Sequence, residues 1–202
     1  MKFANLLIVS TTVALAASSA AAADADSVMP YDWSGFYLGV QGGYLSTNME
    51  LVGTGNRDFN GGTIGAHAGY NWQYGSMVLG LEADINYAWN SISANFGAPI
   101  TVGTDWQGAL RGRLGYAMDR TLIYGAAGLA LTRGYGTSLG TTMTEGFAGW
   151  TLGAGLEHAF ADRWSGRIEY RYAGYYGGDF GLGIGNFRIR EHAVRLGASY
   201  RF

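Results

Sequence analysis

The feature that most constrains the fold is a set of segments in which apolar residues alternate with small or polar ones. Eight such segments occur, each of about ten residues and bounded by turn-forming or polar stretches. Successive side chains of a β-strand point to opposite faces, so this alternation predicts strands with one apolar face. The predicted strands are Trp33 to Tyr44, Thr63 to Gln73, Met77 to Tyr87, Asp105 to Ala117, Thr121 to Thr132, Gly149 to Phe160, Trp164 to Tyr172 and Glu191 to Phe202.

The segment from Thr121 to Thr132 is the least defined of the eight. Its GAAGLAL stretch lets either parity be the apolar one, and a β-bulge would fit there. Which of its side chains face outward is therefore left open.

The connections between the segments alternate in length. Three short turns and four long loops put both chain ends on the short-turn side, which is the plan of an even-stranded outer-membrane barrel. The turns are Tyr74 to Ser76, Met118 to Arg120 and Ala161 to Arg163, and the loops run near Leu45 to Gly62, Ala88 to Thr104, Arg133 to Ala148 and Ala173 to Arg190.

The placement of charge separates a membrane barrel from a soluble one. On seven of the eight segments the apolar parity carries no charge, and on five of these the opposite parity is charged. An arginine facing lipid at the bilayer midplane costs about 2–4 kcal/mol, so charges belong inside such a barrel. We therefore predict an all-β, eight-stranded, antiparallel, up-and-down transmembrane barrel. Aromatic residues near the segment ends fit interfacial girdles, namely Tyr44, Trp72, Tyr87, Trp106, Tyr116, Trp164, Tyr172 and Tyr200.

The inward parity carries a set of arginines and carboxylates that would lie roughly 12–23 Å from the short-turn end, given the rise and tilt of barrel strands. We expect a lumen network in which guanidinium groups pair with carboxylates. Two interpretations stay open, namely simple packing of the lumen and a selectivity filter lined by its arginines. The network residues are Glu82, Asp84, Arg111, Arg113, Glu157, Arg167, Glu169, Arg171 and Arg195.

The N-terminus has the features of a secretory signal peptide. An apolar run from Phe3 to Ala17 follows Lys2, and small residues up to Ala23 supply a cleavage site. The run is shorter than the roughly 20 residues of a membrane-spanning helix. We predict a cleaved signal peptide at residues 1–23, a short N-terminal segment at 24–32 and an outer-membrane barrel at 33–202.

Composition excludes several classes of function. The chain contains no cysteine, which removes thiol catalysis, thiolate metal sites and disulfide scaffolds. Its formal net charge of -2 gives no basic footprint for nucleic acid. We expect no catalytic residue, cofactor or metal.

Several segments together resemble the small alphaproteobacterial outer-membrane proteins called outer-membrane immunogenic or porin-family proteins, within the OmpA-like eight-stranded barrels. The resemblance implies an abundant surface protein, and it implies that Tyr200 and Phe202 form the C-terminal signal read by the barrel-assembly machinery. The matching segments are WSGFYLGVQGGY at Trp33, GAHAGYNWQYG at Gly65, LGLEADI at Leu79, GRLGYAMDR at Gly112, GWTLGAGLEHAF at Gly149, IEYRY at Ile168 and HAVRLGASYRF at the end.

The leading functional hypothesis is a structural, surface-exposed outer-membrane protein that contributes to envelope integrity, in contact with outer-membrane lipid and lipopolysaccharide. A small-solute porin is the first alternative. An adhesin or receptor that binds host or environmental ligands through loops such as Gly174 to Gly185 is the second. A hydrolase is a third, but the three histidines, His67, His158 and His192, show no serine partner with a sequence signature. By parity, His67 faces the lumen and the other two face outward.

Overall fold

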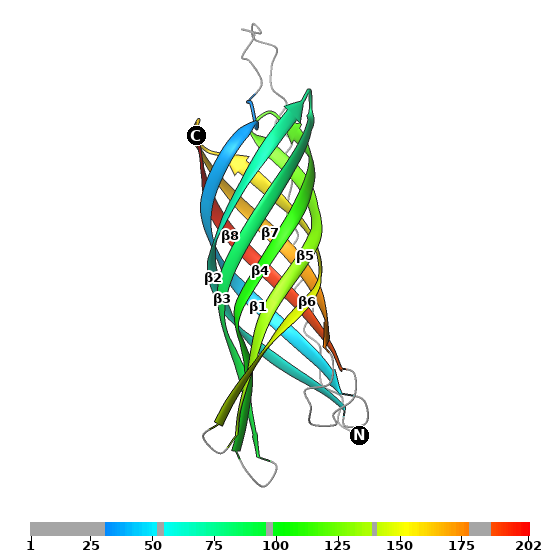
Figure 1. Ribbon diagram of the computed structural model, residues 1–202. Helices are drawn as coiled ribbons and strands as arrows, with labels where there is room; N and C mark the ends of the chain where they lie inside the picture. Colours follow the sequence, from blue (N-terminus) through cyan, green and yellow to red (C-terminus); the bar gives the residue numbers. More distant parts are fainter. Residues whose placement is uncertain (1–30, 52–54, 96–98, 139–140, 178–186) are drawn as a thin grey trace, which may run out of the picture.

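The computed structural model is a closed barrel of eight antiparallel strands (Figure 1). It describes residues 31–51, 55–95, 99–138, 141–177 and 187–202. Each strand pairs with the next in sequence, and β8 pairs with β1 to close the wall. The strands are β1 (Gly35–Leu51), β2 (Gly55–Tyr74), β3 (Met77–Asn95), β4 (Pro99–Met118), β5 (Thr121–Ser138), β6 (Thr141–Ala159), β7 (Trp164–Gly177) and β8 (Phe187–Arg201).

The predicted up-and-down barrel is thus confirmed. The described residues include no helix with the length and apolar character needed to cross a bilayer. The predicted signal peptide lies outside the described residues, as does most of the segment from Gly174 to Gly185.

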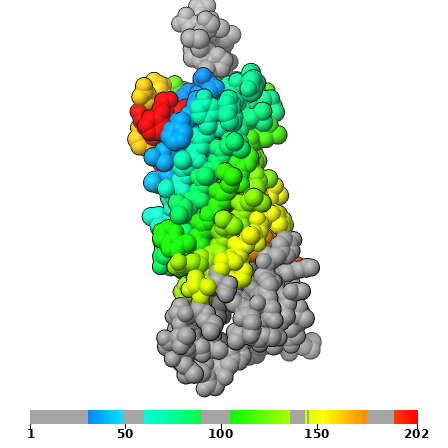
Figure 2. Space-filling view, in the orientation of Figure 1, coloured from blue at the N-terminus to red at the C-terminus, as the bar shows by residue number. Residues whose placement is uncertain are grey.

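The residues that alternate in the sequence face opposite sides of the barrel wall, one parity toward the lumen and the other toward the outside. On β3, Leu79, Leu81 and Ile85 are 46–55% exposed on the outer face. Glu82 and Asp84, between them on the strand, are 1% and 7% exposed in the lumen. A soluble barrel would have the reverse arrangement, so this outer surface suits hydrocarbon. Figure 2 shows one side of the barrel as a continuous wall of side chains.

Aromatic side chains gather on the outer face near both ends of the barrel. The periplasmic girdle lies near the short turns, and the extracellular girdle lies near the other end, as expected for the two membrane interfaces. The periplasmic girdle comprises Phe36, Trp72, Tyr116, Trp164 and Tyr200, and the extracellular girdle comprises Tyr44, Tyr87, Trp89, Trp106 and Trp150.

Two of the three hairpins at the end where the chain terminates in Figure 1 are tight. Gly75 and Ser76 connect β2 to β3, and Asp119 and Arg120 connect β4 to β5. The first residue of each turn has positive φ, 60° at Gly75 and 50° at Asp119. Two-residue turns of that hand match the twist of the paired strands, and glycine or aspartate tolerates the conformation best.

The prediction of four long loops at the opposite end is wrong in extent. Pairing of β1 with β2 continues past Tyr44 up to Leu51 and Gly55, and the β3–β4 and β5–β6 hairpins are extended in the same way. Pairing of β7 with β8 continues only to Gly177 and Phe187. Above the membrane neither strand face meets lipid, so the ladder of hydrogen bonds continues without an apolar parity. The sequence pattern therefore disappears before the strands end.

Two further expectations are corrected. The sequence pattern predicts that the first strand begins at Trp33, but β1 begins at Gly35, whose φ of 120° suits glycine and lets the preceding residues turn into the barrel mouth. On β5, the parity that was left open is now defined: Leu122, Tyr124 and Ala126 are buried. The irregular register near this strand lies in β4, between Thr104 and Trp106, and not in the GAAGLAL stretch.

We expect Leu196→Arg to destabilise the membrane-inserted barrel by about 2–4 kcal/mol, because this side chain faces lipid between the two girdles and is 63% exposed. The control Tyr74→Arg, at the β2–β3 turn, should cost about 0–1 kcal/mol. Urea-dependent folding of the two variants into lipid vesicles measures both changes in free energy. Equal losses at the two positions would contradict the membrane depth assigned to Leu196.

Candidate functional site in the lumen

The structure places all nine of the charged residues named from sequence inside the barrel, where each is at most 7% exposed. They come from five strands, β3, β4, β6, β7 and β8. Charged groups removed from water in this way are tolerated only when they are paired and hydrogen-bonded.

Glu82 on β3 is the centre of the network. Its Oε1 accepts a hydrogen bond from Arg111 Nη2 at 2.5 Å, and its Oε2 accepts one from Arg167 Nη1 at 2.5 Å. The Tyr37 hydroxyl donates to Glu82 Oε2 at 2.9 Å, and Arg113 Nη1 lies 3.6 Å from the same oxygen. One carboxylate therefore holds three guanidinium groups together.

Two further carboxylates complete the coordination of the β4 arginines. Arg111 binds Glu169 with two nitrogen atoms, at 2.7 and 3.1 Å, and Arg113 binds Glu157 at 2.7 Å. The Arg113 guanidinium also lies 4.0 Å from the centroid of the Tyr124 ring, within range of a cation–π interaction. These contacts fix both guanidinium groups across the bore.

Asp84 is the second centre, closer to the extracellular end. Arg171 binds both of its oxygens, at 3.1 and 2.7 Å. Arg195 Nη1 lies 3.5 Å away and Arg111 Nε lies 3.7 Å away, so Asp84 connects the upper arginines to the Glu82 group. Bidentate pairs of this kind are the strongest and most directional ion pairs in proteins.

Most of these bonds cross the lumen and do not follow the sheet. Glu157 and Arg167 are direct neighbours in the β6–β7 register, yet Glu157 binds Arg113 of β4 and Arg167 binds Glu82 of β3. The Glu82–Arg111 pair is an exception, because those two residues are also register neighbours. The network therefore braces opposite walls of the barrel.

Inward glycines give these side chains their space. A Cβ atom at Gly153 would lie 3.3 Å from Arg111 Nη1, and one at Gly197 would lie 3.2 Å from Arg167 Cγ. Either Cβ would crowd the arginine side chain, which would have to shift by a few tenths of an ångström. Glycine on the inward parity is thus part of the network.

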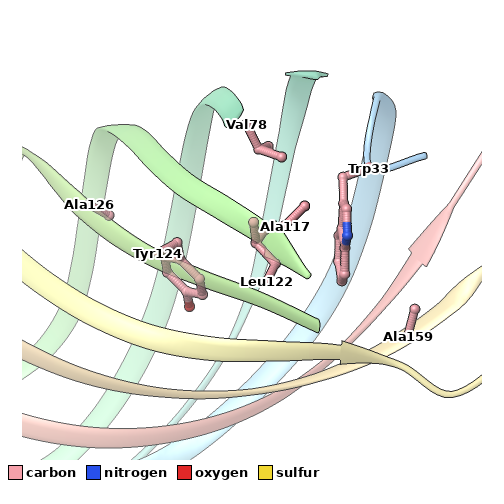
Figure 3. Packing of buried hydrophobic residues seen from close by; sticks show 7 residues of the cluster. All are labelled: Trp33, Val78, Ala117, Leu122, Tyr124, Ala126 and Ala159. Carbon is pink, nitrogen blue, oxygen red and sulfur yellow. The ribbon is translucent and has the colours of Figure 1, made fainter. Parts of the chain in front are cut away.

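An apolar cluster closes the lumen on the periplasmic side of the network (Figure 3). Trp33 is fully buried there, and Figure 3 shows its ring lying across the mouth of the barrel near Ala117 and Ala159. The cluster consists of Trp33, Val78, Ala117, Leu122, Tyr124, Ala126 and Ala159.

Hydrogen bonds hold the chain before β1 in this position. Trp33 Nε1 donates to the Asp119 carbonyl at 3.0 Å, and its backbone amide donates to Gln73 Oε1 at 2.6 Å. The Arg201 guanidinium lies 4.7 Å from the Trp33 ring centroid and donates to the Asp32 carbonyl. The backbone amide of Ser34 donates to the Asp32 carboxylate and holds its pKa below the usual range. Residues 31–34 and Arg201 thus lie together at the periplasmic mouth.

Two smaller apolar clusters lie on the extracellular side of the network. One comprises Leu45, Ala88 and Ala193, and the other comprises Ala130, Phe147, Ala173 and Tyr175. The charged network is therefore enclosed along the barrel axis between apolar side chains, which keep water from its hydrogen bonds.

Sequence reasoning missed a histidine–serine contact. His67 Nε2 lies 2.8 Å from Ser199 Oγ, and both residues are buried in the lumen. No partner among the described residues binds His67 Nδ1, so the third group that orients a catalytic histidine is missing there. In the same described part of the chain, no group of three His, Cys, Asp or Glu side chains could hold a metal ion.

Other polar partners in the lumen were also overlooked, although they lie on the inward parity. Their inward parity could have identified these residues from the sequence, because a polar side chain that faces a charged lumen is expected to form hydrogen bonds with the charged groups. They include Tyr37, Gln41, Asn86, Gln107, Tyr124, Ser165 and Glu191.

Comparison with known proteins now settles the family. The model of the family described as outer membrane protein beta-barrel domain matches residues 10–202. The chain belongs to this family. It is therefore an integral protein of the bacterial outer membrane, with its short turns on the periplasmic side.

Curated relatives have matching names. The chain is 36% identical over 173 residues to a 22 kDa outer membrane protein of Rhizobium leguminosarum bv. viciae, covering 84% of this chain and 78% of that protein. It is 31% identical over 214 residues to the 25 kDa outer-membrane immunogenic protein of Brucella abortus, covering 98% of each. These relatives confirm the resemblance to the immunogenic outer-membrane proteins.

Solved structures share the fold. Neisserial surface protein A superposes with a TM-score of 0.56 at 16% identity, covering 84% of this chain and 98% of that one. Ail, the attachment invasion locus protein of Yersinia pestis, gives 0.50 at 13% identity, covering 84% and 99%.

We expect Glu82→Gln to destabilise the barrel by about 3–5 kcal/mol, because it leaves three buried guanidinium groups without their shared countercharge. Asp162→Asn removes an exposed partner of Arg120 and should cost about 0–1 kcal/mol. Urea unfolding of the membrane-inserted variants measures both. A Glu82→Gln barrel as stable as Asp162→Asn would contradict the central role assigned to Glu82.

Proposed function

We propose that the protein is a closed structural barrel that contributes to envelope integrity and presents its extracellular hairpins to the surroundings. The observation that carries this proposal is the ion-pair network across the lumen, enclosed between apolar clusters. An eight-stranded bore is only wide enough for its side chains to fill. In this barrel the charged lumen side chains form ion pairs with one another across the bore.

The porin alternative requires arginines that face an open path. Arg111, Arg113, Arg167, Arg171 and Arg195 have side chains that are at most 5% exposed, and each lies within 4 Å of a carboxylate. A passing anion would have to displace those partners and leave carboxylates buried without countercharge, which is costly. The lumen arginines are therefore proposed as structural braces.

The surface role of the proposal is supported by the names of relatives. The Brucella proteins are called immunogenic, which fits extracellular parts that molecules outside the cell can reach. Binding of host or environmental ligands by the hairpins of this chain is a further part of the proposal, because surface loops on a rigid scaffold commonly carry such contacts. We propose no enzymatic activity.

We expect the refolded mature protein to be silent in planar bilayers, after heat-modifiable gel mobility shows that it is folded. The double variant Glu82→Ala with Arg111→Ala, which removes both side chains from the centre of the bore, should show conductance steps if it folds. Leu110→Ala, on the outer face, should remain silent like the wild type. Reproducible conductance steps from the folded wild type would overturn the closed-barrel proposal.

We also propose that Tyr200 and Phe202 form the signal read by the barrel-assembly machinery. The terminal Phe202 ring is 69% exposed on the outer face, and its main contacts are the rings of Phe36 and Tyr200, at 5.5 and 5.1 Å. Such an exposed ring contributes little to packing, which supports a role in recognition.

Phe202→Ala should therefore lower the amount of assembled barrel in cells several-fold, while the free energy of unfolding of the refolded variant stays within about 0.5 kcal/mol of the wild type, as for a surface substitution. Phe36→Ala removes the same ring contact but keeps the terminal aromatic residue. Equal assembly of Phe202→Ala and the wild type would refute the signal.

A further inference from the structure

The lipid-facing wall carries a groove of about 530 Å³ at the extracellular girdle, where β3 to β6 lie side by side. Two missing side chains form it. Gly108 lies in register between Ile85 and Leu131, and Gly146 lies in register beside Arg133. All five residues are on the outward parity, so the groove opens toward lipid and not into the lumen.

The floor and lower wall of the groove are apolar. Ile85, Leu131 and Trp106 are 55%, 61% and 45% exposed around Gly108. No atom lies within 4 Å of the position of a Cβ at Gly146, and the nearest atom at Gly108 is 3.5 Å away. A hydrocarbon chain can therefore lie against the barrel in a hollow that a larger residue would fill.

The rim of the groove carries a fixed cation. The Arg133 guanidinium uses Nε and Nη2 to bind Asp105, with distances of 3.1 and 2.5 Å, and its side chain is still 53% exposed. Asp105 is itself held by the backbone amide of Trp106 at 2.7 Å. The ion pair keeps the guanidinium on the wall, with Nη1 directed to none of the described residues.

The height of this cation matches a headgroup. Arg133 lies in register with Trp106 of the extracellular girdle, twelve residues from the start of β5 at Thr121, or roughly 30 Å along the barrel axis. The apolar band of such barrels is about 25 Å tall, so this position lies where headgroup phosphates meet the wall. Arginine forms directional hydrogen bonds with phosphate oxygens.

We propose that this groove binds a phosphorylated glycolipid of the outer leaflet, with one acyl chain over Gly108 and a phosphate on Arg133 Nη1 in the space beside Gly146. The exposed Thr144 hydroxyl at the same rim offers a further donor to the phosphate or a sugar. The choice of glycolipid follows from the side of the membrane, because the groove lies at the extracellular end. The site is independent of whether the lumen conducts.

The test is equilibrium binding of purified lipid A to the folded mature barrel in a zwitterionic detergent, with bound lipid counted by native mass spectrometry. Arg133→Gln, Gly108→Leu and Gly146→Leu should each weaken binding about tenfold or more. Neither glycine has a positive φ, so leucine should be accommodated without backbone strain. Heat-modifiable mobility verifies the folding of every variant.

Matched controls separate the groove from the general lipid surface. Gly112→Leu adds the same side chain to the outer face of β4 outside the groove, and Arg163→Gln removes an exposed arginine at a periplasmic turn. Both should bind lipid A like the wild type. Losses in the controls as large as in the groove variants would overturn the site.

Three other results would also overturn the proposal. Competition by inorganic phosphate alone would mean that the apolar groove contributes nothing. Equal binding of phosphatidylglycerol would exclude selection of the glycolipid. A concentration-dependent dimer that Gly108→Leu abolishes would assign the groove to a second copy of the chain.

Discussion

The structure depends on the need to satisfy every charge that the barrel closes off from water. Glu82 and Asp84 project from β3 toward arginines of three other strands, and those arginines in turn bind Glu157 and Glu169. Because the ion pairs share atoms, removal of one charged side chain leaves its partners with a buried, unpaired charge. The buried charges of the lumen are therefore stabilised as a set, and not as separate pairs.

The balance of charge in the lumen also bears on function. The buried charged side chains of the described lumen are six arginines and five carboxylates, namely Arg111, Arg113, Arg167, Arg171, Arg195 and Arg201 with Glu82, Asp84, Glu157, Glu169 and Glu191. Selectivity filters use an excess of one sign to attract the permeating ion. Here the two signs nearly balance, so the lumen carries little excess charge of either sign with which to attract an ion, and this favours a brace over a filter.

The sequence was sufficient for the wall but not for its interior contacts. The alternation along β3 predicts that Leu81 faces outward and Glu82 inward, because the membrane requires apolar side chains on one face of the strand. It says nothing about which arginine crosses the bore to reach Glu82, since that depends on barrel shear and on side-chain reach. The sequence thus predicts that Glu82, Arg111 and Arg167 all face the lumen, but it predicts neither the Glu82–Arg111 pair nor the Arg167–Glu82 bond.

The other incorrect predictions, on Trp33 and on the long loops, have the same physical origin. Trp33 continues an aromatic pattern in sequence, but Gly35 turns the chain so that its indole closes the mouth of the barrel. The extended hairpins leave no pattern, because water on both faces imposes none.

On the lipid-facing surface, where apolar side chains are expected, residues that depart from this pattern indicate a possible binding site. Gly108 and Gly146 leave space beside the exposed side chains of Ile85 and Leu131, and Arg133 places a charge there at the height of the girdle. The lumen then accounts for the stability of the barrel, while the exceptions on its outer wall indicate what the barrel recognises in its membrane.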